Sequence, residues 1–314
     1  MKASKWLIIS LLIVIVSLFF IFVPLKKYTY HGFYFDTYVK VKFFAKNPLN
    51  AKKTIKLLKG EFERIDRIPV KGIKAGKIDS ALVHIIKGSL KISKMSEGVF
   101  DPTVDPVLNS WHYFKEPVIP SKGTIDSLLT FVDYRKVALI GDSLSLPRGM
   151  SLNIGGSAKG YALNCMRNIF KKMEIHSALV EAGGDIVLVG KKKGNNDWLI
   201  GVRHPRDRNG IIGICNLSDC FIATSGDYER CFFIDSIRYH HIINPETGYP
   251  VREIQSVTVI GEDGLIVDGL STAIFAMGMN MALEFVEKNQ LEAIIVDSSG
   301  KIHSFTERFE MGDL

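Results

Sequence analysis

Most of the strands expected in this 314-residue chain come in pairs, and a short turn joins the members of each pair. Val137–Ile140 and Leu144–Leu146 flank a Gly-Asp turn, and Ala178–Gly190 holds two β-rich runs around a glycine pair. Ile211–Cys215 and Cys220–Thr224 are expected to form a further hairpin. Hairpins build antiparallel pairs, and the chain shows no regular alternation of strand and helix. The pattern therefore predicts an α+β fold of antiparallel or mixed sheets with interspersed helices.

Apolar residues recur at helical spacing in several segments between these strands. The expected helices are Leu49–Arg67, Asp79–Lys94, Ser121–Leu129, Lys159–Met173, Leu265–Met277 and Met281–Lys288. Tyr34–Phe44 alternates in the manner of a single strand. Phe100–Trp111 contains two Asp-Pro pairs, which favour an extended, turn-rich connection.

The N-terminus contains about twenty consecutive uncharged residues, Trp6–Leu25, enough to cross a hydrocarbon layer roughly 30 Å thick. A cleavable signal peptide has a shorter apolar stretch and a small-residue cleavage site. We therefore expect residues 1–27 to form an uncleaved transmembrane anchor and residues 28–314 to form one globular domain. The expected location is the bacterial cytoplasmic membrane, crossed once, with the domain on the outer, periplasmic side.

The formal net charge of +7 is spread along the chain, without a long Lys/Arg block or a C2H2 spacing. This excludes nucleic acid as an expected partner, whereas a phosphorylated ligand or an anionic membrane surface fits the charge. The four cysteines show no zinc spacing. Cys215 and Cys220 would face each other across the expected hairpin and could form a disulfide; the alternative is buried free thiols.

The central segment Asn153–Asn164, NIGGSAKGYALN, joins an apolar strand to an amphipathic helix. Gly155 and Gly156 leave room around the backbone, and Ser157 is placed to cap the helix. The N–H groups of a helix N-terminus attract anions, and Lys159 in the first turn would add to that attraction. A plain turn with a solvated lysine is the alternative.

Asp268 and Thr272 are four residues apart, so one helix face presents both a carboxylate and a hydroxyl. Mg²⁺ takes such oxygen ligands together with substrate phosphates, although this spacing is also common by chance. His240 and His241 on a strand would point to opposite faces, and one of them is a candidate general base. No Walker A, GxGxxG or GxSxG pattern is present.

Six segments together, in order and spacing, resemble the ApbE family, the FAD:protein FMN transferases. They are FDPTVDPVLNSW, IGGSAKGYALN, VEAGGDI, ATSGDYER, HHIINPETGYPV and VDGLSTAIFAMG, and they lie between about Gly98 and Gly278. The resemblance implies an ApbE-like fold and a Mg²⁺-dependent enzyme that splits FAD and transfers FMN onto a Thr or Ser hydroxyl, releasing AMP. It also implies an acceptor that is a flavin-carrying subunit of a membrane redox complex.

The resemblance assigns a role to each matching position of this chain. The metal would be held by Asp268, Thr272 and the backbone carbonyl of Ala158. FAD would be bound by Gly155, Gly156, Ser157, Lys159, Gly160, Asp185, Thr224, Ser225, Gly226 and His241. His241, Asp268 and Lys159 would be the catalytic residues, with His241 as the base. Asn164 departs from the family pattern, in which an aspartate usually occupies that place.

Three other functions remain open at this point. An FAD pyrophosphatase would release FMN and AMP to water through the same residues. A non-catalytic, membrane-tethered FAD-binding protein would have little use for a metal-and-base set. A structural, membrane-tethered interaction domain would leave the chemistry of the glycine segment unexplained.

Overall fold

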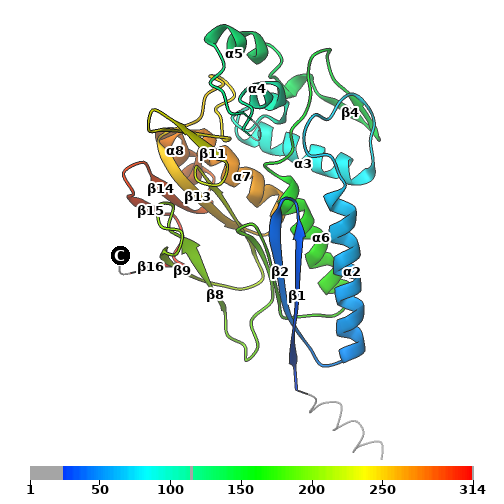
Figure 1. Cartoon of the computed structure of the whole chain (residues 1–314). Helices are drawn as coiled ribbons and strands as arrows, with labels where there is room; N and C mark the ends of the chain where they lie inside the picture. Colours follow the sequence, from blue (N-terminus) through cyan, green and yellow to red (C-terminus); the bar gives the residue numbers. More distant parts are fainter. Residues whose placement is uncertain (1–23, 114–115, 313–314) are drawn as a thin grey trace, which may run out of the picture.

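A computed structural model of the chain describes residues 24–113 and 116–312. Its centre is an eight-stranded sheet with the strand order β1-β2-β6-β7-β10-β13-β14-β15 (Figure 1). The strands are β1 (Lys26–Tyr34), β2 (Thr37–Ala45), β6 (Ala178–Ala182), β7 (Asp185–Val189), β10 (Phe221–Gly226), β13 (Ile254–Gly261), β14 (Glu292–Asp297) and β15 (Ile302–Ser304). Every pairing in the described part of this sheet is antiparallel, which confirms the α+β prediction.

The first two strands form a hairpin where the sequence predicted one strand, Tyr34–Phe44. Phe35 and Asp36 form its turn, both with positive φ (56° and 57°). The alternating pattern hid this turn because Phe35 is not a residue that signals one. β1 already begins at Lys26, before the expected end of the anchor at residue 27.

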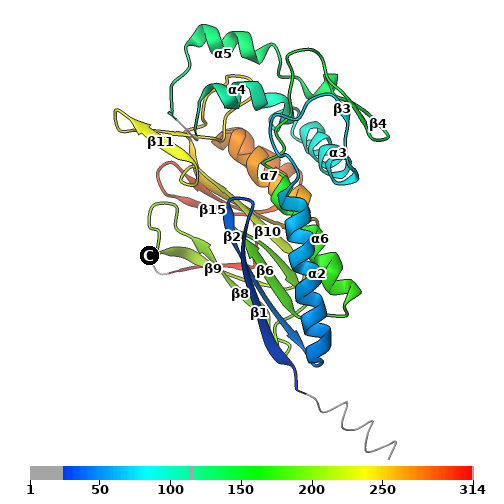
Figure 2. The same ribbon diagram turned by 45° about the vertical axis from the view of Figure 1, so that its right-hand side comes forward.

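The helices of the described chain are α2 (Pro48–Asp66), α3 (Ser80–Met95), α4 (Asp105–Ser110), α5 (Lys122–Leu129), α6 (Ala158–Lys172), α7 (Gly264–Ala276) and α8 (Met279–Lys288). Of these, α2, α6, α7 and α8 pack on one face of the main sheet, and α3 packs on α7. α4 and α5 lie past the end of the sheet (Figures 1 and 2). Asn47, Asp79 and Asp263 cap the first turns of α2, α3 and α7 with their side chains. The long helices therefore begin and end within about two residues of the predicted positions, because capping residues and apolar periodicity are local signals.

A small sheet covers the other face of the main sheet, with the order β16-β9-β8. Its strands are β8 (Trp198–Arg203), β9 (Ile211–Leu217) and β16 (Phe309–Met311). One core cluster lies between the helices and the main sheet. A second, which includes Phe44, Leu188 and Trp198, lies between the two sheets. The domain thus has three layers.

Five short strands and two 3-10 turns complete the described chain. β3 (Gly76–Lys77), β4 (Ala138–Ile140) and β5 (Ser143–Ser145) form one small sheet, and β11 (Cys231–Ile234) pairs with β12 (Ile237–His240). The 3-10 turns are Pro102–Val104 and Tyr134–Lys136. The predicted hairpin on either side of the Gly-Asp turn is confirmed as β4–β5.

The predicted hairpin between Ile211–Cys215 and Cys220–Thr224 is wrong. β9 pairs with β8 and β16, whereas β10 enters the main sheet between β7 and β13. The chain therefore changes sheets between the two strands, which a local pattern does not reveal. Cys215 and Cys220 are buried free thiols, and Cys165 and Cys231 are free thiols in partly buried positions, so no disulfide joins them.

The segment Phe100–Trp111 is mostly helical, not extended as predicted. Asp101 accepts a hydrogen bond from the N–H of Thr103 at 2.8 Å, and α4 follows the 3-10 turn directly. Each proline of the two Asp-Pro pairs occupies an early helical position, where its missing N–H is not needed. The pairs therefore start short helices here.

The predicted anchor lies almost entirely in residues 1–23, outside the described residues. Within residues 24–113 and 116–312, none of the helices combines the length and apolar character that crossing a membrane requires.

Candidate functional site

The glycine segment and the first turn of α6 form one side of the candidate site. Oδ1 of Asn153 accepts the N–H of Gly155 at 2.9 Å. Ser157 occupies the N-cap position of α6 but makes no capping hydrogen bond with its side chain. Its buried hydroxyl is instead bonded to that of Ser89 on α3, at 2.8 Å. The predicted Ser157 cap is therefore wrong, because a tertiary partner takes the hydroxyl.

Glycines let α7 approach this segment closely. A Cβ atom on Gly156 would lie 3.2 Å from Oγ1 of Thr272. A Cβ atom on Gly160 would overlap the carbonyl oxygen of Gly264 and lie 2.8 Å from Cβ of Asp268. The N–H of Gly160 donates to Oδ2 of Asp268 at 2.8 Å. At Gly160 only glycine lets the Asp268 face of α7 come this close without a shift of backbone, and at Gly156 glycine avoids a tight contact with Thr272.

Lys159 extends from the first turn of α6 to two carboxylates. Its ammonium forms a direct ion pair with Asp185, at the start of β7, and lies 3.7 Å from Oδ1 of Asp268. Burial by itself would lower the pKa of Lys159, but the two carboxylates raise it overall. Burial raises the pKa of Asp268, and Asp185 acts in the same direction. When both carboxylates are ionised, two negative charges share one ammonium in a site shielded from water.

β10 brings hydroxyl groups to the same place. Oδ1 of Asp185 accepts the N–H of Thr224 at 3.1 Å. The hydroxyl of Ser225 lies 3.1 Å from that of Thr272 and 2.8 Å from that of Ser271 on α7. Four elements, α6, α7, β7 and β10, therefore converge, and the predicted residues on them form one connected network.

The structure separates the two adjacent histidines. His240 is buried, its Nε2 is 2.6 Å from the carbonyl of Val251, and its Nδ1 accepts the N–H of Ile242 at 3.3 Å. Both ring nitrogens of His240 are thus used within the fold. His241 is partly exposed, and its buried Nδ1 has no hydrogen-bond partner among the described residues.

Electrostatics keep the imidazole of His241 neutral. Desolvation lowers the pKa of His241, and the positive charges of Arg230 and Lys159 act in the same direction. Lys159 is thus close enough to influence His241, although no direct bond joins them. With a pKa of about 3, the imidazole is neutral at pH 7 and able to accept a proton, but it is a weak base until a nearby negative charge, such as that of a diphosphate, raises its pKa.

Sequence reasoning missed the role of Asp227, the residue after the predicted Gly226. Its carboxylate binds the guanidinium of Arg206 through two hydrogen bonds of 2.7 Å and that of Arg238 through one of 2.8 Å. Arg238 lies on β12, just before the histidine pair. Asp227 therefore ties the end of β10 to the strand that precedes His241. The motif contains the aspartate, but no sequence signal pairs it with arginines at these distances along the chain.

Asn164 connects α6 to the N-terminus of α7. Its Oδ1 accepts the N–H of Gly264 at 2.8 Å, and its Nδ2 donates to Asp263 at 3.0 Å. Asp263 is itself the N-cap of α7. An amide serves both bonds here, whereas a carboxylate could not donate to Asp263.

No group of three or more His, Cys, Asp or Glu side chains in the described residues is arranged to hold a metal ion. The predicted magnesium ligands are of another kind, with Asp268 as the one carboxylate beside Thr272 and a backbone carbonyl. Gly156 and Gly160, two residues on either side of Ala158, pack against Thr272 and Asp268. Oδ1 of Asp268 stays beyond hydrogen-bond distance of Lys159. Oxygen donors beside an excess negative charge fit Mg²⁺.

Comparison with known proteins assigns this architecture to a family. The ApbE family matches residues 35–295, a range that contains every predicted site residue. The chain belongs to the ApbE family.

Similar proteins share both sequence and fold with this ApbE family member. It is 28% identical over 226 residues to the FAD:protein FMN transferase of Vibrio cholerae, covering 70% of this chain and 67% of that protein. It is 31% identical over 220 residues to the FAD:protein FMN transferase of Treponema pallidum, covering 64% and 61%. The crystal structure of the ApbE protein of Thermotoga maritima superposes with a TM-score of 0.80 at 31% identity, covering 89% and 97%.

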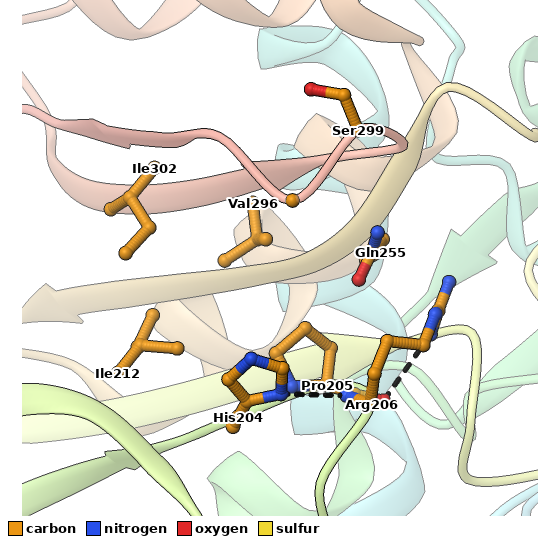
Figure 3. A pocket seen from close by; sticks show the side chains of 9 residues that line it. His204, Pro205, Arg206, Ile212, Gln255, Val296, Ser299 and Ile302 are labelled. Carbon is orange, nitrogen blue, oxygen red and sulfur yellow. Dashed lines mark hydrogen bonds between the residues drawn. The ribbon is translucent and has the colours of Figure 1, made fainter. Parts of the chain in front are cut away.

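A separate cavity of about 230 Å³ lies between the main sheet and the small sheet (Figure 3). Ile212, Val296 and Ile302, from the second core cluster or packed against it, form its apolar wall, beside the ring of His204. Oε1 of Gln255 is buried there without a hydrogen-bond partner among the described residues. The predicted site residues do not line this cavity, which is therefore distinct from the Lys159 site.

Proposed function

We propose that this chain is an FAD:protein FMN transferase. The observation that carries the proposal is the ion-paired group of Lys159, Asp185 and Asp268, which Ser271 links to Ser225 and Thr272, so that four elements of the fold contribute. Buried charges of both signs beside hydroxyl groups suit the handling of a diphosphate. The names of the relatives support flavin transfer, and the family match covers all of these residues.

In the proposed reaction, the hydroxyl oxygen of an acceptor Thr or Ser bonds to the phosphorus of the FMN half of FAD. The bond from that phosphorus to the bridging oxygen breaks, and AMP leaves. His241 takes the hydroxyl proton, since its imidazole is neutral and partly exposed. Lys159 and the loop glycines Gly155, Gly156 and Gly160 hold the diphosphate. A base in this position typically contributes about 10²–10⁴-fold.

Asp268, Thr272 and the carbonyl of Ala158 would hold Mg²⁺, which when bound would neutralise charge on the diphosphate. Asp185 holds Lys159 in place and Thr224 holds Asp185. Together with Ser225 and Gly226, these residues would line the flavin or acceptor cleft. Positioning matters because the attacking oxygen must be in line with the leaving group.

The test incubates the full chain with FAD, Mg²⁺ and a candidate acceptor, and follows in-gel flavin fluorescence on the acceptor and AMP release. Asp268→Asn should lose transfer and metal binding together. His241→Ala should keep FAD, measured by flavin fluorescence on binding, and lose about 10²–10⁴-fold in transfer. Asp36→Asn and His31→Ala, both on the exposed β1–β2 hairpin, are matched controls that should transfer normally.

Three outcomes decide the proposal. Labelled acceptor with AMP supports transfer. AMP without labelled acceptor would instead identify an FAD pyrophosphatase, and bound FAD without either product would identify a carrier. Full transfer by Asp268→Asn would remove the magnesium assignment, and so would a rate of transfer that EDTA leaves unchanged.

We also propose the location and the class of partner. The apolar residues 6–25 support a single-pass anchor in the bacterial cytoplasmic membrane, with the domain on the outer side. The acceptor would then be a flavin-carrying subunit of a membrane redox complex. Membrane fractionation and protease accessibility of the domain from the outer side test this; a protein recovered in the soluble fraction contradicts it.

A further inference from the structure

Exposed lysines gather at the end of the domain where the described chain begins. They come from four separate segments: residues 24–27, residues 46–53 around the start of α2, residues 171–177 after α6, and residues 190–197 between β7 and β8. These ten side chains, here called the lysine end, are Lys26, Lys27, Lys46, Lys52, Lys53, Lys171, Lys172, Lys191, Lys192 and Lys193. All ten residues are exposed.

Contacts between the four segments fix this arrangement. Nδ2 of Asn50, in the first turn of α2, donates to the carbonyl of Met173 after α6, at 3.0 Å. The N–H of Phe44, at the end of β2, donates to the carbonyl of Ser177 at 2.9 Å. β6 and β7 pair along their whole length, so residues 191–193 leave the sheet beside the start of β6. Figures 1 and 2 both show these segments at the end from which β1 starts.

The charge of the whole protein is concentrated at the lysine end. Within the four segments the only acidic residues are Glu174 and Asp197, so the segments carry a net charge of +8. The whole chain carries +7, and the rest of it therefore sums to −1. Among these ten lysines, Lys191 is the one with a salt bridge to a carboxylate, 3.8 Å from Asp197. The other nine lysines of this surface form no salt bridge with a carboxylate of the described residues.

An exposed apolar side chain and an apolar run next to the lysine end in the sequence indicate which partner this surface binds. Leu49 is 75% exposed in the first turn of α2, among the lysines. The apolar run Trp6–Leu25 directly precedes Lys26 in the sequence. Clustered lysines beside an apolar segment are typical of anionic lipid recognition. We propose that the lysine end is a docking surface that lies on a bilayer of anionic phospholipids.

This orientation places the candidate site away from the lipid. α6 begins at the site with Ala158 and ends at Lys172, in the lysine end. Its 15 residues span about 22 Å at 1.5 Å per residue. The Lys159 network therefore stands roughly 20 Å from the proposed lipid surface.

The experiment reconstitutes the full chain in vesicles of phosphatidylcholine alone, or of phosphatidylcholine mixed with phosphatidylglycerol. An amine-reactive reagent then labels lysines, and mass spectrometry measures the rate at each. In the anionic vesicles the lysine end should react at least about threefold more slowly than in the neutral ones. High salt should remove the difference, since it screens exposed charges. The control lysines Lys74, Lys87, Lys91, Lys94 and Lys288 should react equally in all vesicles.

Two variants with the same loss of charge separate position from net charge. One replaces Lys171, Lys172, Lys191, Lys192 and Lys193 with Gln. The other replaces the five control lysines with Gln; three of these lie on α3, near the other end of α2 (Figure 1). The first variant should lose protection at Lys26 and Lys46, whereas the second should keep it.

Equal labelling of the lysine end in both lipids would overturn the proposal. So would equal protection of the control lysines, or the same loss of protection in both variants. None of these readouts uses FAD or an acceptor, so failure of the docking surface and failure of the proposed flavin transfer are observed separately.

Discussion

The crossing of α6 and α7 gives a sharp prediction for Gly160→Ala. The new Cβ atom would overlap the carbonyl of Gly264 and lie 2.8 Å from Cβ of Asp268. Because two carbon atoms in contact need about 3.5–4.0 Å, the helices must separate locally by about 1 Å. Overpacking of this kind costs about 1–3 kcal/mol, and more where backbone must move.

Two further effects adjust that magnitude. Alanine is favoured over glycine inside a helix by about 1 kcal/mol, which offsets part of the loss. The N–H of Gly160 would also move away from Asp268, and a hydrogen bond to a charged group is worth about 1.5–3 kcal/mol. We expect a net loss of about 3 kcal/mol, or a melting temperature lower by roughly 6 °C for a domain of this size.

Gly60→Ala is the matched control. Gly60 is exposed within α2, and a Cβ atom there would meet nothing within 4 Å. The same substitution should therefore stabilise the protein by up to about 1 kcal/mol, raising the melting temperature by roughly 2 °C. Circular dichroism at rising temperature measures both. If Gly160→Ala melts at or above the wild-type temperature, the close approach of the two helices is refuted.

Three other residues give further predictions. Asn164→Ala removes both bonds to the start of α7 and should destabilise the protein by about 1–2 kcal/mol, seen as a lower melting temperature; an unchanged value would show that Asp263 suffices as the cap. Asp227→Asn weakens the pairs with Arg206 and Arg238 and should lower both stability, by about 2–3 kcal/mol, and the rate of flavin transfer; normal transfer would contradict its positioning role. Burial lowers the pKa of His240 below its usual value of 6.5, so the unfolded chain binds more protons, and stability falls as the pH drops below 6.5. His240→Gln should show a flatter decline between pH 6.5 and 5 in denaturation titrations; an equally steep decline would assign the effect to other groups.

Much of the candidate site was predictable from the sequence because its residues lie in short motifs with their own local signals. The glycine segment before Lys159, the Asp268–Thr272 spacing and the histidine pair were each recognisable in this way. Their joint meaning came from the order of six motifs. The choice of His241 over His240 as the base rested on the motif alone. The structure adds a physical reason, because both ring nitrogens of His240 are already hydrogen-bonded within the fold.

The sequence by itself determined the long helices, most of the strands and the antiparallel class of the fold, since periodicity and capping act over a few residues. Only the tertiary structure decided that β9 and β10 enter different sheets, so that Cys215 lies in the small sheet and Cys220 lies just before a strand of the main sheet. It also decided that Ser157 bonds to Ser89 and that Asp227 gathers two arginines. Each of these depends on partners that the three-layer packing brings together from far along the chain, and no local pattern encodes them.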